Sequence, residues 1–371
     1  MNPFRYGQIV RDEYFCERSE LSELLNSYIE RGQNVLVQGE RRVGKSSLIS
    51  QTINGLTKYR LLYIDLLEVK TADDFVKRIV TAIMSMEKEA GFLERVFQKL
   101  SSLKPVVSMD PLTGMPTMSV DSSVRFSPDN IPGIMDMVFS YSSKSKPLVV
   151  VFDEFQDVLN LPNADATLAL LRSKIQFHAD LPYIFAGSVR NKMDMIFTSP
   201  DSAFFKSALV LDVGPLGREE FLQFLTEKFA NGWRNLPAEI GQRLFDICFE
   251  IPGDVQQLCG ALWDCTAEGE EVTASHLPMA LDRIFAHESK SYEMTLKIIT
   301  GQQLRFLTNL ARLGGKAPTS AKFLKESGIS QPSSIRTALK RLQDLKILFH
   351  HSGEYRFVNP FFRAWLLHKG L

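Results

Sequence analysis

The eight residues Gly39–Ser46 constrain the fold more than any other part of the chain. They read Gly-Glu-Arg-Arg-Val-Gly-Lys-Ser and match the phosphate-loop pattern G-x-x-x-x-G-K-[S/T]. An apolar run precedes them and a helical segment, Ser47–Ile53, follows. Glycines let the backbone curl so that its N–H groups face phosphate oxygens, and the following helix adds the positive end of its dipole. The segment therefore predicts a nucleotide-binding loop between a buried strand and a helix.

The residues of this loop have distinct expected roles. Lys45 is expected to reach the β- and γ-phosphates of ATP, and the hydroxyl of Ser46 is expected to ligate Mg²⁺. The other residues expected to line the nucleotide are Gly39, Glu40, Arg41, Arg42, Val43, Gly44 and Ser47. The cofactors implied are ATP or ADP, together with Mg²⁺.

A pair of carboxylates follows a second apolar run, Leu148–Phe152. Asp153 stands where P-loop enzymes hold Mg²⁺, and Glu154 stands where a carboxylate can polarise the attacking water. A strand that simply ends in solvated acids is the alternative. The chain order, with the phosphate loop first and the acids later, favours the catalytic interpretation.

Five short apolar runs predict the strands of one sheet. Helical patterns separate most of them, which favours a mostly parallel sheet covered on both faces. The segment 105–133 is rich in proline and glycine and is expected to form a hairpin insertion. The five expected strands are Asn34–Gln38, Arg60–Asp65, Leu148–Phe152, Tyr183–Ala186 and Leu209–Val213.

The sequence predicts three domains. The α/β core covers residues 1–216, and apolar residues at helical spacing predict a small helical domain over 217–298. Residues 299–371 show three helical segments and a short β pair, an order that resembles a winged helix-turn-helix. This last segment holds 12 Lys and Arg against 3 Asp and Glu, a net charge of +9 in a chain whose total is zero. The excess suggests an anionic partner.

Composition narrows the protein class further. No run of about 18 apolar residues predicts a membrane span, and the N-terminal residues lack the pattern of a signal peptide. The four cysteines show no metal-binding spacing and are expected to be reduced. A cytoplasmic location is expected.

Taken with its motifs, the chain resembles the archaeal-type prokaryotic ATPases of the signal-transduction (STAND) branch of AAA+-related P-loop ATPases. The resemblance implies a P-loop core, a helical lid and a C-terminal winged helix. It also implies that the segment around Phe15 and Arg18 folds over the adenine. The alternative is that Ser19 caps a helix and Arg18 is a surface residue.

The same resemblance assigns sensor positions. Ser188 matches the residue whose strand end faces the γ-phosphate, and Arg190 matches a phosphate-sensing cation. The sequence departs from the family pattern at two positions. Lys206 occupies the place of an intersubunit arginine, and Glu250 the place of a glycine two residues before a proline. Lysine lacks the planar fork of arginine, so an arginine-finger role is not implied here.

The basic C-terminal segment has two candidate partners, double-stranded DNA and protein. In a winged helix the third helix enters the major groove, and here Arg336, Lys340 and Arg341 lie on that helix. Arg356 lies at the wing. Winged helices of this family also act as regulatory caps on the ATPase core, so both interpretations stay open.

Together these features predict an ATP-hydrolysing switch that couples nucleotide state to rearrangement of the lid and the winged helix. The first alternative is a non-catalytic, nucleotide-stabilised adaptor or DNA-binding protein, against which Glu154 argues. The second is a phosphotransferase, which would need an acceptor pocket and an arginine-bearing lid that the sequence does not indicate.

Overall fold

The computed structural model describes residues 1–86, 105–109, 116–120, 125–142, 147–188, 190–329, 331–351 and 353–370. These residues form two compact units. One contains residues 9–214, and the other contains residues 215–371 together with residues 1–8.

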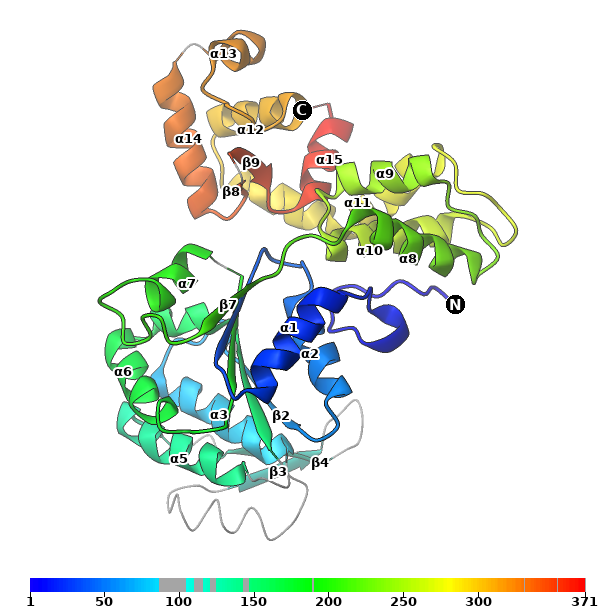
Figure 1. Ribbon diagram of the computed structural model, residues 1–371. Helices are drawn as coiled ribbons and strands as arrows, with labels where there is room; N and C mark the ends of the chain where they lie inside the picture. The colour runs from blue at the N-terminus through cyan, green and yellow to red at the C-terminus, as the bar shows by residue number, and fades with distance from the viewer. Residues whose placement is uncertain are drawn as a thin grey trace. The chain divides into compact units, whose positions relative to one another are not determined.

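A five-stranded parallel sheet forms the centre of the unit of residues 9–214 (Figure 1). The order is β2-β5-β6-β1-β7, so the strand before the phosphate loop lies between β6 and β7. The five expected strands are confirmed to within one residue at each end. Their bounds are β1 Val35–Gln38, β2 Arg60–Asp65, β5 Leu148–Asp153, β6 Tyr183–Gly187 and β7 Leu209–Asp212.

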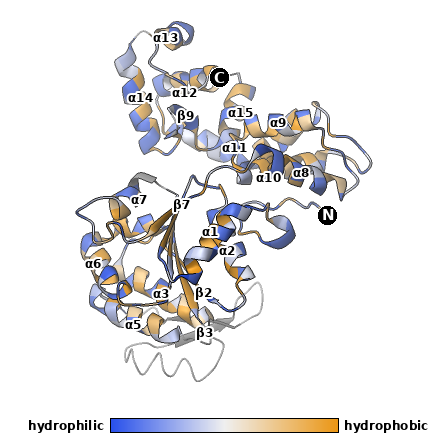
Figure 2. Cartoon of the chain, viewed as in Figure 1, coloured by the Kyte–Doolittle hydropathy of each residue, from blue (hydrophilic) through white to orange (hydrophobic). Residues whose placement is uncertain are grey.

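Helices cover both faces of this sheet because its central strands are apolar on both sides. All six residues of β5 are buried, and Figure 2 shows the central strands as hydrophobic. One face packs on α3 Ala72–Met86, α5 Ile131–Tyr141 and α6 Ala164–Ile175 in a single apolar cluster. The opposite face carries α1 Ser19–Glu30 and α2 Lys45–Gly55. A further helix, α7 Arg190–Phe197, follows β6.

The expected hairpin is present as an antiparallel pair, β3 Pro105–Met109 with β4 Pro116–Val120. The turn expected between them, at residues 110–115, lies outside the described residues, as do residues 121–124. Beyond them the chain returns to the N-terminal end of α3.

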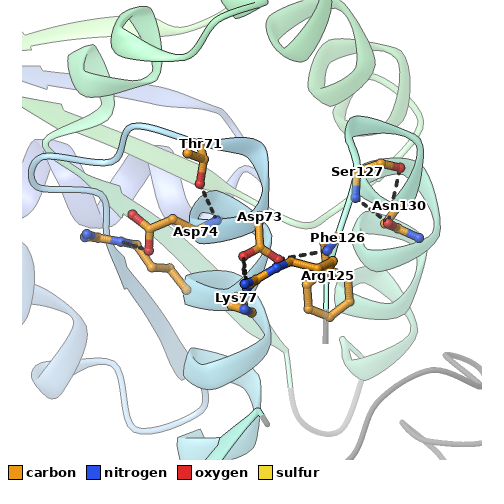
Figure 3. Close-up of polar contacts among 9 residues, drawn as sticks. Thr71, Asp73, Asp74, Lys77, Arg125, Phe126, Ser127 and Asn130 are labelled. Atoms are coloured by element: carbon orange, nitrogen blue, oxygen red, sulfur yellow. Dashed lines mark hydrogen bonds and ion pairs between the residues drawn. The ribbon is translucent and has the colours of Figure 1, made fainter. Parts of the chain in front are cut away.

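Asp73 of α3 anchors that return (Figure 3). Its carboxylate accepts the N–H of Phe126 at 2.8 Å and the ammonium of Lys77 at 3.0 Å, and it pairs with Arg125 at 3.5 Å. Burial by itself would raise the pKa of Asp73, but the Phe126 N–H and the two cations bring that pKa below its ordinary value. Ser127 and Asn130 then form a capping box at the short helix η2, Pro128–Asn130, which leads into α5.

The second unit begins with a bundle of four helices, α8 Arg218–Ala230, α9 Ala238–Ile247, α10 Pro252–Cys265 and α11 His276–Lys297. The N-terminal residues pack here. Phe4 contacts Phe229 and Trp263 with ring centroids 5.0 and 6.1 Å apart, and Asn2 donates to the carbonyl of Gly260. The sequence had placed residues 1–8 in the core, whereas their contacts are with α8 and α10.

A winged helix completes the second unit. It contains α12 Gly301–Leu313, α13 Ala321–Ser327, α14 Pro332–Asp344, and the antiparallel strands β8 Leu348–His351 and β9 Glu354–Phe357. A final helix, α15 Pro360–His368, was not expected. It packs on α11, where Tyr292 contacts Phe362 and Trp365 with ring centroids 5.3 and 5.4 Å apart. Among the described residues, no helix is both long and apolar enough to cross a membrane.

Candidate nucleotide-binding and hydrolysis site

The phosphate loop joins the C-terminal end of β1 to α2. Gly39 follows the strand, and a Cβ built there would lie 2.3 Å from the carbonyl oxygen of Val213, so no larger residue fits. Gly44 has φ of 96° and is the N-cap of α2. Left-handed backbone at this position turns the chain sharply into the helix, as a phosphate-binding loop requires.

Lys45 is the first residue of α2, and its side chain folds back over the loop. The ammonium donates to the carbonyl oxygens of Gly39 at 3.2 Å and Glu40 at 2.8 Å. Lys45 is only 6% exposed. Burial lowers the pKa of the ammonium below its ordinary value, and the charges of Glu154 and Asp153 partly offset that effect. Among the described residues, Lys45 is the only lysine or arginine that is buried. The negative charge of a bound phosphate would compensate the burial of its ammonium.

The remaining loop residues differ in exposure. Val43 is buried and Arg41 is exposed, while Arg42 adopts a φ of 66°. Ser47 accepts the N–H of Val10 at 3.1 Å, so the N-terminal segment runs along the start of α2. The role of Ser47 toward a nucleotide stays a prediction.

Arg18 ties the N-terminal segment to the loop. Its guanidinium donates to the carbonyls of Val43 and Gly214, both at 2.8 Å, and burial lowers its pKa. Ser19 is not the helix cap, because α1 begins at Ser19 with Arg18 itself at the N-cap position, and Arg18 is half-buried. Phe15 is 7% exposed, and its contact with adenine stays a prediction.

Asp153 lies at the end of β5, beside the start of α2. Its Oδ2 accepts the Ser46 hydroxyl at 2.7 Å and also the hydroxyl of Tyr63 from β2. Burial, followed by the charge of Asp153, raises the pKa of Tyr63, which keeps this hydroxyl a proton donor. Sequence reasoning missed Tyr63. No motif marks Tyr63, because its contact with Asp153 follows from the parallel register that pairs Tyr63 with Val151, two residues before Asp153.

Glu154 is turned toward β6. It adopts a left-handed backbone with φ of 51° and ψ of 40°, and its Oε2 accepts the Ser188 hydroxyl at 3.0 Å. The same oxygen accepts the side-chain amide of Gln156, a second residue that sequence reasoning missed. Three elements therefore bring together Lys45, Ser46, Asp153, Glu154 and Ser188.

The resemblance also concerns Arg190, Lys206 and Glu250. Arg190 begins α7, and its side chain is not among those described. Lys206 is exposed, with its ammonium 5.2 Å from the ring centroid of Phe205. Glu250 has φ of 63°, a backbone region that favours glycine, and pairs with Arg218. The departure from glycine at this position is thus accommodated with a strained backbone.

The basic residues of the winged helix belong to the second unit. Arg336, Lys340 and Arg341 are exposed on α14. Arg356 of β9 is less available, because its Nε donates to Glu354 at 3.2 Å and its guanidinium lies 5.7 Å from the ring centroid of Phe249. The prediction that these four residues contact DNA stays a prediction.

The donor set fits the expected cofactors. A serine hydroxyl and an aspartate carboxylate 2.7 Å apart are the hard oxygen ligands that Mg²⁺ takes while retaining water and phosphate ligands. No group of three or more His, Cys, Asp and Glu side chains able to hold a metal occurs among the described residues. Ser46 and Asp153 would hold Mg²⁺ through two of its six positions, and phosphate oxygens and water would complete the coordination.

Comparisons with known proteins bear on the fold. A family described as a probable winged helix domain matches residues 290–368. No curated protein matches the sequence. Among solved structures, a Walker-type ATPase of Pyrococcus abyssi is similar over 98% of this chain and 99% of its own, with a TM-score of 0.64 and 17% identity.

Two proteins of Aeropyrum pernix extend the comparison. ORC2 in its ADP form is similar over 98% of this chain and 98% of its own, with a TM-score of 0.53 and 14% identity. ORC1, solved in complex with DNA, covers 96% of this chain and 94% of its own with a TM-score of 0.51 and 12% identity. The fold is that of a P-loop ATPase with a C-terminal winged helix, as the sequence predicted.

Proposed function

We propose that this protein is an ATP-hydrolysing molecular switch. The observation that carries the proposal is the convergence of Ser46, Asp153 and Glu154 beside a phosphate loop whose lysine is buried. A binding module needs the loop alone. A carboxylate held beside the metal-binding pair is the additional group that hydrolysis requires.

Each side chain has a defined part in the proposed reaction. Lys45 and the loop N–H groups bind and orient the β- and γ-phosphates. Bound Mg²⁺ supplies charge neutralisation for the phosphates. Glu154 accepts a proton from the attacking water as the water oxygen bonds to the γ-phosphorus, and the bond to the bridging oxygen breaks to leave ADP and phosphate.

The switch part of the proposal rests on Arg18. One guanidinium donates both to Val43 in the phosphate loop and to Gly214, the last residue before the chain enters the second unit. A change in the loop on nucleotide binding would alter this shared contact. The same residue thus links nucleotide state to the connection that carries the lid helices and the winged helix.

A DNA duplex is the partner that we propose for the winged helix. Support comes from the exposed cations on α14, the net charge of +9 over residues 299–371, and the likeness to ORC1. A protein partner is the second candidate, because Arg356 and Arg363 both lie 5.7 Å from the ring centroid of Phe249 and are less available to DNA phosphates.

The test of hydrolysis is the substitution Glu154→Gln, compared with Glu293→Gln at an exposed position of α11. The amide cannot take the proton from water, so Glu154→Gln should bind ATP normally and lose at least about a hundredfold in turnover. Release of free phosphate without an added acceptor measures the reaction and separates it from phosphotransfer. Wild-type turnover in Glu154→Gln would contradict the role of this carboxylate.

A further inference from the structure

Gln156 is a buried polar residue that the phosphate loop, the acidic pair and the sensor positions leave without a role. It is 2% exposed, and its amide Nε2 donates to Oε2 of Glu154. We propose that Gln156 is a positioning residue that holds the Glu154 carboxylate in place for hydrolysis. This inference rests on the function proposed above.

The backbone after β5 brings Gln156 back to Glu154. The left-handed conformation of Glu154 starts the short helix η3, Phe155–Asn160, and the carbonyl of Glu154 accepts the N–H of Asp157 at 2.9 Å. Phe155 fixes this turn in the core, with its ring 4.7 Å from that of Phe185 on β6. The separation between residues 154 and 156 is therefore set by packed backbone.

The orientation of the amide follows from its partner. A carboxylate accepts hydrogen bonds only, so the Nε2 atom must face Glu154 and the Oε1 atom must point away. Oε1 has no hydrogen-bond partner among the described residues, although it is buried. Buried acceptors normally receive a hydrogen bond, and leaving one without a donor costs free energy. Such a cost indicates that another contact fixes the orientation of the side chain. The bond to Glu154 is that contact.

Gly187 makes room for this arrangement. A Cβ at Gly187 would lie 2.5 Å from Oε1 of Gln156 and 2.6 Å from the sulfur of Met193. The next residue, Ser188, donates to the same carboxylate oxygen as Gln156. Two consecutive residues at the end of β6 thus position the Glu154 carboxylate. Gly187 leaves space for the Gln156 amide, and the Ser188 hydroxyl donates a hydrogen bond.

This arrangement leaves one oxygen for chemistry. Both donors bind Oε2, and the Ser188 hydroxyl is 3.5 Å from Oε1. Oε1 is therefore the atom that can accept a proton from water while Oε2 is held. Loss of one donor would let the carboxylate rotate, and small misplacements of a catalytic group reduce rate strongly.

The variant that tests the inference is Gln156→Met, which keeps the length of the side chain and removes the donor. We expect kcat for ATP hydrolysis to fall about ten- to a hundredfold, with KM and the affinity for a fluorescent ATP analogue changed less than about twofold. Gln176→Met, at an exposed position, is the matched control. Gly187→Ala should give the same kcat loss, because its methyl group displaces the amide while Gln156 is retained.

The outcomes separate this inference from the function on which it rests. A wild-type protein without turnover defeats the proposed function itself. If the wild type hydrolyses ATP, Glu154→Gln does not, and a folded Gln156→Met keeps wild-type kcat, only the role of Gln156 is overturned. If Gln156→Met fails to fold, Gly187→Ala decides alone, since normal kcat in that variant would equally contradict the proposal.

Discussion

At the scale of single residues, Asp153 and Glu154 are adjacent in the chain but have different hydrogen-bond partners. Asp153 is bonded to Ser46 and Tyr63, whereas Glu154 is bonded to Ser188 and Gln156. The left-handed backbone of Glu154 separates the two carboxylates. One is thereby placed to hold a cation at the phosphate loop and the other to act as a base.

The sequence predicted Lys45, Ser46, Asp153, Glu154 and Ser188 because each occupies a motif position. Tyr63 and Gln156 could not be found in that way. Tyr63 reaches Asp153 through strand register, and Gln156 reaches Glu154 through a turn whose left-handed start is unusual for glutamate. Both contacts depend on three-dimensional placement rather than on spacing.

Asp153→Asn should weaken the dependence of the reaction on Mg²⁺. The neutral amide is a poorer ligand partner for a hard cation and also loses its charge-assisted bond to Ser46. The Mg²⁺ concentration for half-maximal turnover should rise about ten- to a hundredfold, by analogy with losses at metal-supporting positions. Asp157→Asn, which changes a carboxylate that accepts the N–H of Glu68, is the control, and an equal effect in both variants would count against the assignment.

At the scale of elements, the sequence predicted the strands of the sheet but missed the last helix. Uninterrupted apolar runs identify buried parallel strands such as β5. The final helix, α15, was missed although Asn359-Pro360 is a good helix start and Phe361, Phe362, Trp365 and Leu366 show helical spacing. Its position in the unit depends on packing against α11, which the sequence alone did not indicate.

Asn359 should be an important cap for α15. Its side chain accepts the N–H groups of Phe361 and Phe362, and its amide donates to Glu288 of α11 at 3.0 Å. Asn359→Ala should destabilise the protein by about 1–2 kcal/mol, as measured by thermal and denaturant unfolding. Thr300→Ala, which removes the exposed cap of α12, should cost less because it breaks no contact between helices, and the reverse order would contradict this account.

The helix α14 should carry the electrostatic part of duplex binding. The affinity of the full chain should fall with salt at a log–log slope of about −0.9 per phosphate contacted. Lys340→Ala should reduce the magnitude of that slope by about one, while Lys290→Ala on the exposed side of α11 should leave it unchanged. Absence of duplex binding at low salt would assign the basic surface to a protein partner instead.

At the scale of the whole molecule, two points of the chain connect the units, one after residue 8 and one after residue 214. The first was not expected, because the apolar contacts of Phe4 with Phe229 and Trp263 link positions far apart in sequence. The second is bonded to the phosphate loop through Arg18. Arg18 therefore joins the phosphate loop to the residue after which the chain enters the second unit.

The most direct test of the central claim is a titration of wild-type and Lys45→Ala protein with a fluorescent ATP analogue in the presence of Mg²⁺. Loss of a charged donor to phosphate should lower the affinity at least about tenfold, and Lys77→Ala on α3 should bind like the wild type. Circular dichroism shows whether each variant is folded. A folded Lys45→Ala protein that binds the analogue with wild-type affinity would contradict the account, because the nucleotide would then not occupy the loop at Gly39–Ser46.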